Sequence, residues 1–290
     1  MPDELNTKLI RRRLEKTADT YASHSIVQKE IAHRVLERLD YIKQTPERIL
    51  DMSLHGVDSE ALLRKRFPKA SYIAAMPFMA GLQQRKSHWF RSLRSLCMPF
   101  DCIPLQAGSV DFIFMNLRLL WSHDWPLLLR ECRRVLMPKG MLLLTSLGPD
   151  TLIELRHAFV DSQQRPAVHS FIDLHDIGDV LVGAGFENPV MDMERLVMQY
   201  SSFTSLVTDL RLTGSQYAAG HQSLGLTTPR QWQLLAEHYP KNNRLLYPAT
   251  FEIIYGHAWA GEQLPQKTTE TGEILVSLQS LKVKKGAEGV

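Results

Sequence analysis

The stretch Arg48-Ile-Leu-Asp-Met-Ser-Leu-His-Gly-Val-Asp-Ser-Glu60 decides the fold of this chain. Its apolar start, Ile49 to Met52, predicts a buried strand, and the pattern changes to that of a helix at about 59–66. A strand, a tight turn and a helix N-terminus form the usual binding place of a nucleotide-like ligand. Such a turn normally contains several glycines, because its backbone approaches the ligand closely. Gly56 is the single glycine of this turn, so its ability to hold a cofactor is the central question.

Strands and helices alternate from this stretch to about residue 146. Near-continuous apolar runs predict buried strands at 48–53, 71–76, 110–116 and 141–145, with a weaker candidate at 96–101. Between them, helical patterns are found at about 59–66, 81–94 and 125–136, and Met137-Pro-Lys-Gly140 is expected to stop the last one. Buried strands separated by helices predict an α/β fold with a doubly wound, mostly parallel sheet.

Helical segments are expected on both sides of this region. Residues 1–45 form an N-terminal helical segment, with an amphipathic helix from Ser25 to about Tyr41. After the sheet, helices are predicted at 150–160, 174–184, 203–212 and 229–239, and strands at 190–200 and 251–259. The period-2 pattern of the last strand indicates an outer strand. We expect one domain over 46–260, with a substrate-side lid within 160–250, and a mostly flexible tail over 261–290.

Composition excludes several classes of function. The 290 residues are 44% hydrophobic and 22% charged, with a net charge of +3, as in a soluble globular protein. The basic runs near the two ends, 11–13 and 282–285, lack interleaved aromatic residues, so no nucleic-acid partner is expected. Cys97, Cys102 and Cys132 lack metal-ligand spacing, which predicts neither a metal site nor a disulfide framework. With no apolar run of about 20 residues and no apolar leader, we expect no membrane association and a cytoplasmic location.

Two later stretches carry a family pattern: Leu105-Gln-Ala-Gly-Ser-Val-Asp-Phe-Ile-Phe-Met-Asn116 and Leu129-Arg-Glu-Cys-Arg-Arg-Val-Leu-Met-Pro-Lys-Gly140. They resemble the fourth strand and the following block of class I S-adenosylmethionine methyltransferases. Residues 18–24, 148–155, 209–214 and 247–251 are similar to those of BioC-type malonyl-acyl-carrier-protein O-methyltransferases of biotin synthesis. A related branch, the methyltransferase-like factors for assembly of mitochondrial respiratory complex I, shares the stretches 148–155 and 209–214.

The resemblance implies S-adenosylmethionine as the cofactor and assigns residues to it. Asp51 keeps the acidic position at the end of the first strand, which in the family faces the ammonium of the cofactor. The glycines of the family's loop are replaced by Ser53, His55 and Val57, although Gly56 remains in the turn as a cofactor-binding candidate. Whether this degenerate loop still accepts the cofactor is left open by the sequence.

Four further positions complete the implied cofactor site. The family's ribose-binding carboxylate falls at or near Met76, and the loss of its hydrogen bonds costs roughly 1–3 kcal/mol per missing partner. Asp101 matches an acidic residue beside the adenine. Tyr21 lies over the cofactor in the family, or else packs the N-terminal helix. Asn116 ends the fourth strand beside the expected methyl group, where it lines the pocket or caps a turn.

The implied substrate is a malonyl group on acyl carrier protein. Arg211 is the candidate for its carboxylate, because a guanidinium binds a carboxylate bidentately; a surface helical arginine is the alternative. A carboxylate nucleophile is already ionised at neutral pH, so no catalytic acid or base is assigned. The carrier is acidic, so basic residues of this chain are expected to dock it. The rival hypotheses are a binding or assembly protein that has lost normal cofactor binding and a different modification on the same fold.

Overall fold

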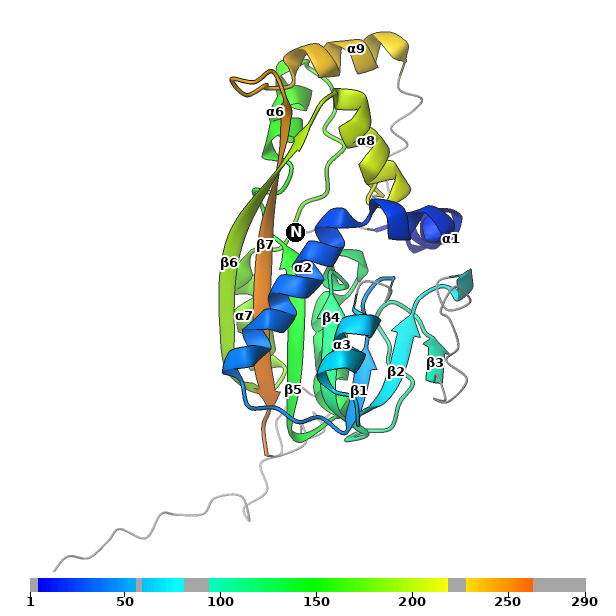
Figure 1. Cartoon of the computed structure of the whole chain (residues 1–290), viewed down its shortest axis with the longest axis vertical. Helices are drawn as coiled ribbons and strands as arrows, with labels where there is room; N and C mark the ends of the chain where they lie inside the picture. The colour runs from blue at the N-terminus through cyan, green and yellow to red at the C-terminus, as the bar shows by residue number, and fades with distance from the viewer. Residues whose placement is uncertain (1–4, 56–58, 81–93, 219–227, 263–290) are drawn as a thin grey trace, which may run out of the picture.

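A seven-stranded mixed sheet is the centre of the computed structural model, which describes residues 5–55, 59–80, 94–218 and 228–262 (Figure 1). The strands lie in the order β3-β2-β1-β4-β5-β7-β6. Those from β1 to β5 are parallel, and β7 is antiparallel to both β5 and β6. The bounds are β1 Arg48–Asp51, β2 Ser71–Met76, β3 Arg94–Cys97, β4 Val110–Asn116, β5 Leu136–Leu147, β6 Phe186–Tyr200 and β7 Tyr247–Ala260. The predicted doubly wound, mostly parallel sheet is confirmed.

Helices cover both faces of this sheet. Those of the described residues are α1 Thr7–His24, α2 Ile26–Glu37, α3 Glu60–Arg66, α5 Trp125–Val135, α6 Ile153–Asp161, α7 Leu174–Gly183, α8 Phe203–Leu212 and α9 Pro229–His238, with short 3-10 helices at Arg38–Tyr41 and Leu119–Trp121. The predicted helix at 81–94, the residues Gly56 and Val57 and the predicted flexible tail lie wholly or mostly outside the described residues. None of the described helices is long and apolar enough to cross a membrane.

The buried strands explain the continuous apolar runs of the sequence. Along β4, Phe112 and Phe114 pack into the core on the side of α2 and α3. Ile113 and Met115 point to the opposite face and pack against α5 and α7. Because successive side chains of a strand point to opposite faces, a strand covered on both sides needs apolar residues at nearly every position.

The antiparallel pair β6–β7 extends beyond the parallel strands and carries the C-terminal helices. Figure 1 shows α6, α8 and α9 grouped around the far end of this pair, with α1 lying between them and the carboxyl ends of the parallel strands. Ile10, Leu14 and Ala18 of α1 pack in one cluster with Leu54 and Phe78, which follow β1 and β2. Helix α1 therefore covers the edge of the sheet at which parallel α/β folds bind ligands.

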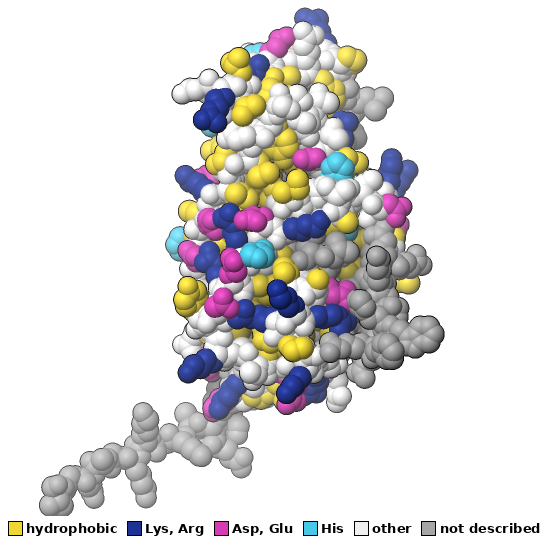
Figure 2. All heavy atoms as spheres, viewed as in Figure 1, with side chains coloured by type: hydrophobic (Ala, Val, Ile, Leu, Met, Phe, Trp, Pro, Cys, Tyr) yellow, Lys and Arg dark blue, Asp and Glu magenta, His cyan; other side chains and the backbone are white. Residues whose placement is uncertain are grey.

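Charged pairs link helix α2 and the 3-10 turn after it to β6. Arg34 pairs with Glu194 of β6, and Nη1 of Arg38 lies 2.9 Å from Oδ2 of Asp192. Figure 2 shows charged side chains of both signs gathered over the face that α2 and β6 occupy. These partly exposed pairs each add little stability. Gln28 of the same helix lines the pocket at the sheet edge described below.

One prediction about a strand was wrong. Strand β7 is not an outer strand: it lies between β5 and β6, and β6 forms the edge. The polar residue of its alternating pattern, Glu252, is buried instead of facing solvent. Its carboxylate accepts a hydrogen bond from the backbone N–H of Asp150. Helix α5 ends at Val135, just before Met137-Pro-Lys-Gly140, as expected, and residues 137–140 already belong to β5. There the pairing register with β4 shifts and Lys139 has a φ of 64°, so the proline and glycine lie at an irregularity of the strand.

Candidate functional site

The strand order changes direction between β1 and β4, which places a crevice at their carboxyl ends. Asp51 organises the turn there. Its buried carboxylate accepts hydrogen bonds from the backbone N–H of Ser53 at 2.9 Å, from Oγ of Ser59 at 2.7 Å and from the hydroxyl of Tyr72. These bonds join β1, the turn, the start of α3 and β2. The contact of Asp51 with a cofactor stays a prediction, since its carboxylate is directed to this local network.

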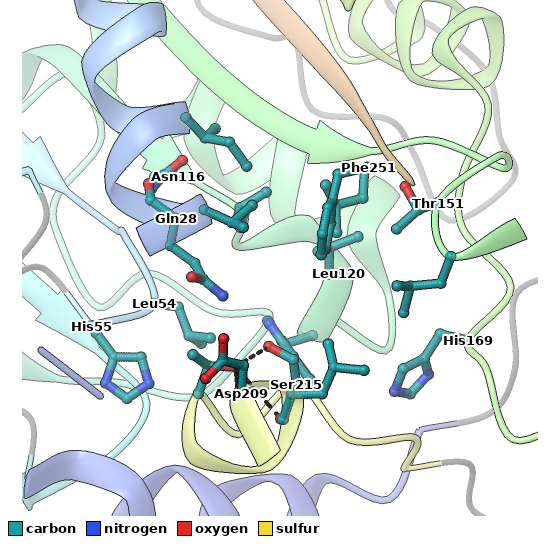
Figure 3. A pocket seen from close by; sticks show the side chains of 18 of the residues that line it. Gln28, Leu54, His55, Asn116, Leu120, Thr151, His169, Asp209, Ser215 and Phe251 are labelled. Atoms are coloured by element: carbon teal, nitrogen blue, oxygen red, sulfur yellow. Dashed lines mark hydrogen bonds between the residues drawn. The ribbon is translucent and has the colours of Figure 1, made fainter. Parts of the chain in front are cut away.

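A first pocket opens beside this turn, between the sheet edge and the helices α1, α2 and α8 (Figure 3). Leu54 and His55 lie on one side of it, and the opposite side carries Thr151 and His169. Its free volume is about 80 Å³, whereas pockets that hold drug-sized ligands typically measure roughly 300–1,000 Å³. The pocket is therefore narrow in this arrangement.

The side chain of His55 closes the pocket on the side of the turn. Its ring is stacked on that of Tyr21, with 3.5 Å between the centroids and 17° between the planes, and meets Phe78 edge-on at 5.1 Å. His55 is 3% exposed, and burial lowers the pKa of its imidazole to about 3. Its Nε2 is buried with no hydrogen-bond partner among the described residues. An aromatic pair stabilises by about 0.5–1.5 kcal/mol, whereas an unpaired buried polar atom costs about 1–3 kcal/mol. These two terms oppose each other, so the net free energy that favours the buried position of the ring is small.

Two predicted site residues, Tyr21 and Asn116, both line this pocket. The amide of Asn116 is fixed from two sides: its Nδ2 donates to the carbonyl of Gln28 at 3.2 Å, and Oγ1 of Thr145 donates to its Oδ1 at 2.6 Å. These bonds connect the end of β4 to α2 and to β5. Asn116 thus holds the pocket together, and its contact with a ligand stays a prediction, as does that of Tyr21.

Asp101 is not among the described residues that line this pocket. Its carboxylate accepts a hydrogen bond from Oγ of Ser122. Nearby, the buried Arg118 donates to the carbonyls of Pro99 and Phe100, and burial lowers the pKa of Arg118 to about 10. Asp101 therefore helps to balance the charge of a buried guanidinium, and its predicted role beside an adenine is untested by this geometry.

Met76 is buried at the end of β2, and no residue of β2 lines the pocket among the described residues. The carbonyl of Met76 accepts a hydrogen bond from the N–H of Met98 at 2.9 Å. The position expected for a ribose-binding carboxylate is thus taken by an apolar side chain. Gly56, the remaining cofactor candidate of the turn, is outside the described part of the chain.

A polar cluster in the same pocket was missed by reasoning from sequence. Nδ1 of His24, at the end of α1, lies 3.1 Å from Oδ1 of Asp209 in α8. Burial, and secondly the negative charge of Asp209, raises the pKa of Tyr200 to about 12. No spacing rule connects these residues, because 185 positions separate His24 from Asp209. They belong to two separate stretches of the family pattern, 18–24 and 209–214, which only the fold brings together.

A second pocket, with a volume of about 670 Å³, lies between α1, α6, α8 and α9. Arg211 lines it, with its guanidinium carbon 5.2 Å from the ring centre of Trp232. Arg13 also lines it, and its Nη1 donates to the carbonyls of Gln216 at 3.1 Å and Tyr217 at 2.6 Å. Arg165 is the third guanidinium of this lining.

The two pockets adjoin and differ in charge. Both are lined by Leu152, His169, Phe171, Leu210 and Ser215. Of the described residues, those lining the first pocket include the carboxylate of Asp209 and no lysine or arginine, whereas those lining the second include three arginines and no carboxylate. The first pocket therefore suits a cation and the second an anion. A group of side chains able to hold a metal ion was not found in the described residues.

Comparisons with known proteins agree with this architecture. A family model described as "Methyltransferase domain" matches residues 56–144. A malonyl-acyl-carrier-protein O-methyltransferase from Gallionella capsiferriformans (strain ES-2) is 38% identical over 264 residues, covering 88% of this chain and 91% of that protein. One of the same name from Halorhodospira halophila (strain DSM 244 / SL1) is 33% identical over 288 residues, covering 96% of each.

Among solved structures, the YcgJ protein of Bacillus subtilis has a TM-score of 0.56 at 14% sequence identity, over 80% of this chain and 100% of that one. At this identity the likeness concerns the fold alone. Together with the family model, the relatives and the sheet order, it confirms the predicted class I methyltransferase fold.

Proposed function

Because the chain belongs to the malonyl-acyl-carrier-protein O-methyltransferase family, we propose that it methylates the free carboxylate of a malonyl group carried by acyl carrier protein, a step of biotin synthesis. The enzyme is an S-adenosylmethionine-dependent O-methyltransferase. When bound, S-adenosylmethionine supplies an electrophilic methyl group on a sulfonium. The product is the malonyl methyl ester, still attached to the carrier.

The observation that carries this proposal is the charge contrast between the adjoining pockets. A sulfonium cofactor is a cation, and the first pocket offers the carboxylate of Asp209, whose neighbour in the described lining is the imidazole of His24 rather than a lysine or arginine. A malonyl carboxylate is an anion, and the second pocket offers three guanidiniums without a carboxylate. Asp209 and Arg13 are partly buried, where opposite charges attract more strongly than in water, whereas Arg165 and Arg211 are exposed at the mouth of their pocket. The shared wall of the pockets is where the two reactants would meet.

The residues of the first pocket fit the cofactor in charge and position, although two of the family's usual contacts are absent. Tyr21, Asn116 and Asp209 are the described residues that would hold it, and Asp51 would act by fixing the turn. The departures are the apolar Met76 at the end of β2 and the imidazole of His55 in the turn. Lost hydrogen bonds of this kind weaken binding by tenfold for each 1.4 kcal/mol or so.

Arg211 is the residue we assign to the malonyl carboxylate. Its guanidinium is held over Trp232, which leaves its planar donors preoriented for bidentate binding. The carboxylate needs no deprotonation at neutral pH, so the protein acts by orienting it and by excluding water. Leu210 and Phe171, which line both pockets, supply apolar surface at the meeting point.

The exposed face of α1 is our candidate for the docking of the carrier. Lys8, Arg11, Arg12 and Lys16 are exposed on this helix, whose Arg13 lines the second pocket. An acidic carrier protein docked there would place its acyl arm beside the pocket that is lined by arginines. Such rim charges act mainly on the association rate and on specificity.

The direct test is to incubate the protein with S-adenosylmethionine and malonyl-acyl carrier protein and to measure the methyl ester by mass spectrometry. We expect Arg211→Ala to raise KM for the malonyl carrier at least tenfold while leaving the affinity for S-adenosylhomocysteine unchanged. Arg230→Ala is the matched control, because Arg230 is an exposed arginine of α9 outside the lining of either pocket. Absence of methyl ester at saturating cofactor would favour a non-catalytic binding protein instead.

A further inference from the structure

We propose that the imidazole of His55 is a plug in the first pocket, and that the ring must leave its place against Tyr21 before the cofactor can bind. His55 thereby limits the affinity of the protein for its methyl donor. This inference rests on the proposed function, since it concerns the cofactor side of the same site.

The position of the ring is the first argument. His55 follows β1 at the point where the strand order reverses, which is where a doubly wound sheet binds its ligand. At such a turn the backbone normally approaches the ligand, and a side chain in its place takes up the room. The ring is enclosed between Tyr21 and Phe78, and the pocket keeps a free volume of about 80 Å³. This is below the roughly 300 Å³ at which ligand pockets begin.

The bonding of the ring is the second argument. Its contacts with Tyr21 and Phe78 are ring contacts, and Nε2 has no hydrogen-bond partner in the described part of the chain. When the imidazole turns out of the pocket, water can hydrogen-bond to this nitrogen. The stacking that is lost and the hydrogen bond that is gained are of similar size, so the ring can move at small net cost.

The charge of the His55 ring decides whether it opposes cofactor binding by electrostatic repulsion or by the space it fills. Burial lowers the pKa of His55 to about 3, so the enclosed imidazole is neutral at physiological pH. A neutral ring does not repel a cationic ligand. His55 therefore opposes binding through the space that it fills, and a smaller residue at this position is expected to strengthen binding.

The test is a calorimetric titration of the full-length protein with S-adenosylhomocysteine. We expect His55→Ala to bind S-adenosylhomocysteine at least tenfold more tightly than the unaltered protein does. If only the variant binds it detectably, that result supports the proposal equally. His55→Phe keeps a ring of similar size but has no nitrogen, so its affinity should stay as weak as that of the unaltered protein. His157→Ala, which removes an exposed histidine of α6, controls for the loss of an imidazole elsewhere and should change nothing.

Weaker binding by His55→Ala would overturn the proposal and make His55 a ligand contact; equal binding, or binding by neither protein, would overturn it too. A second measurement needs no variant. At saturating ligand, the NMR cross-peaks between the rings of His55 and Tyr21 should disappear, and their persistence would contradict the plug. The proposed function fails separately, when a variant that binds the cofactor forms no methyl ester on malonyl-acyl carrier protein.

Discussion

The imidazole of His24 and the carboxylate of Asp209 meet with 3.1 Å between Nδ1 and Oδ1, which joins the end of α1 to α8. Their side chains are 34% and 32% exposed, so the pair contributes little to stability. Its effect is on position. It places a carboxylate in the lining of the first pocket, one residue before Leu210, which lines both pockets.

The first prediction concerns the ionisation of Tyr200. The charge of Asp209 is the second cause that raises the pKa of this phenol, after burial. Asp209→Asn should therefore lower the pKa of Tyr200 from about 12, while burial keeps it above its usual value of about 10. Absorbance titration of the variant against the unaltered protein measures the change. Equal titration curves would show that the carboxylate does not act on Tyr200 in solution.

Much of the fold was predictable because its signals are local. The bounds of β2, β4 and α8 agree with those predicted from the sequence. Strands covered on both faces require unbroken apolar runs, and α8 is marked at its start by the Ser202 cap and at its end by Gly214, which has a φ of 73°. The place of β7 was not predictable, because burial of Glu252 depends on a backbone donor about 100 residues away.

The site was predictable only in part. Tyr21, Asn116 and Arg211 are candidates by resemblance, and each lines one of the two pockets, while their contacts with ligands stay predictions. The sequence could not show that these pockets adjoin, since their shared lining comes from four separate regions between 152 and 215. Nor could it show that His55 faces Tyr21, a contact set by the packing of α1 on the sheet edge.

The second prediction concerns Asp51. In Asp51→Ala, the N–H of Ser53 and the hydroxyls of Ser59 and Tyr72 lose a buried acceptor. At about 1–3 kcal/mol for each unpaired group, the free energy of unfolding should fall by about 3 kcal/mol or more. Urea denaturation measures it. Asp111→Ala is the control, because Asp111 accepts backbone hydrogen bonds at an exposed place and should cost less. An equal loss in the two variants would contradict the organising role of Asp51.

Asp51→Asn separates this structural role from the role in cofactor binding. The amide keeps one acceptor oxygen and the shape of the side chain but removes the negative charge. If the carboxylate meets the ammonium of the cofactor, this variant should fold and bind S-adenosylhomocysteine at least tenfold more weakly. Calorimetric titration measures the affinity, and an unchanged affinity would restrict Asp51 to holding the turn.

The third prediction is a loss of stability in acid that depends on His55. Burial lowers the folded pKa of His55 to about 3, while the unfolded chain takes up this proton near pH 6.5. The contribution of the neutral, buried ring to the free energy of unfolding is therefore complete above about pH 6.5. It is lost as pH falls toward 3, at about 1.4 kcal/mol per pH unit. Between pH 7 and 5, the unaltered protein should lose up to about 2 kcal/mol more than His55→Phe. Urea denaturation of both proteins at both pH values measures this difference, and parallel losses would show that the ring is not enclosed as a neutral group.

The fourth prediction tests docking of the carrier on α1. Reversal of two charges in the variant Arg11→Glu/Arg12→Glu should raise KM for malonyl-acyl carrier protein about tenfold, because the exposed face would then repel an acidic partner. With malonyl-pantetheine, which lacks the carrier, KM should stay the same. The double variant Lys43→Glu/Lys69→Glu makes the same change in net charge at exposed positions that precede β1 and β2, at the opposite end of the sheet. If both variants raise KM equally, net charge alone governs the encounter; if only the α1 variant does, and added salt weakens the difference, the carrier docks on this helix.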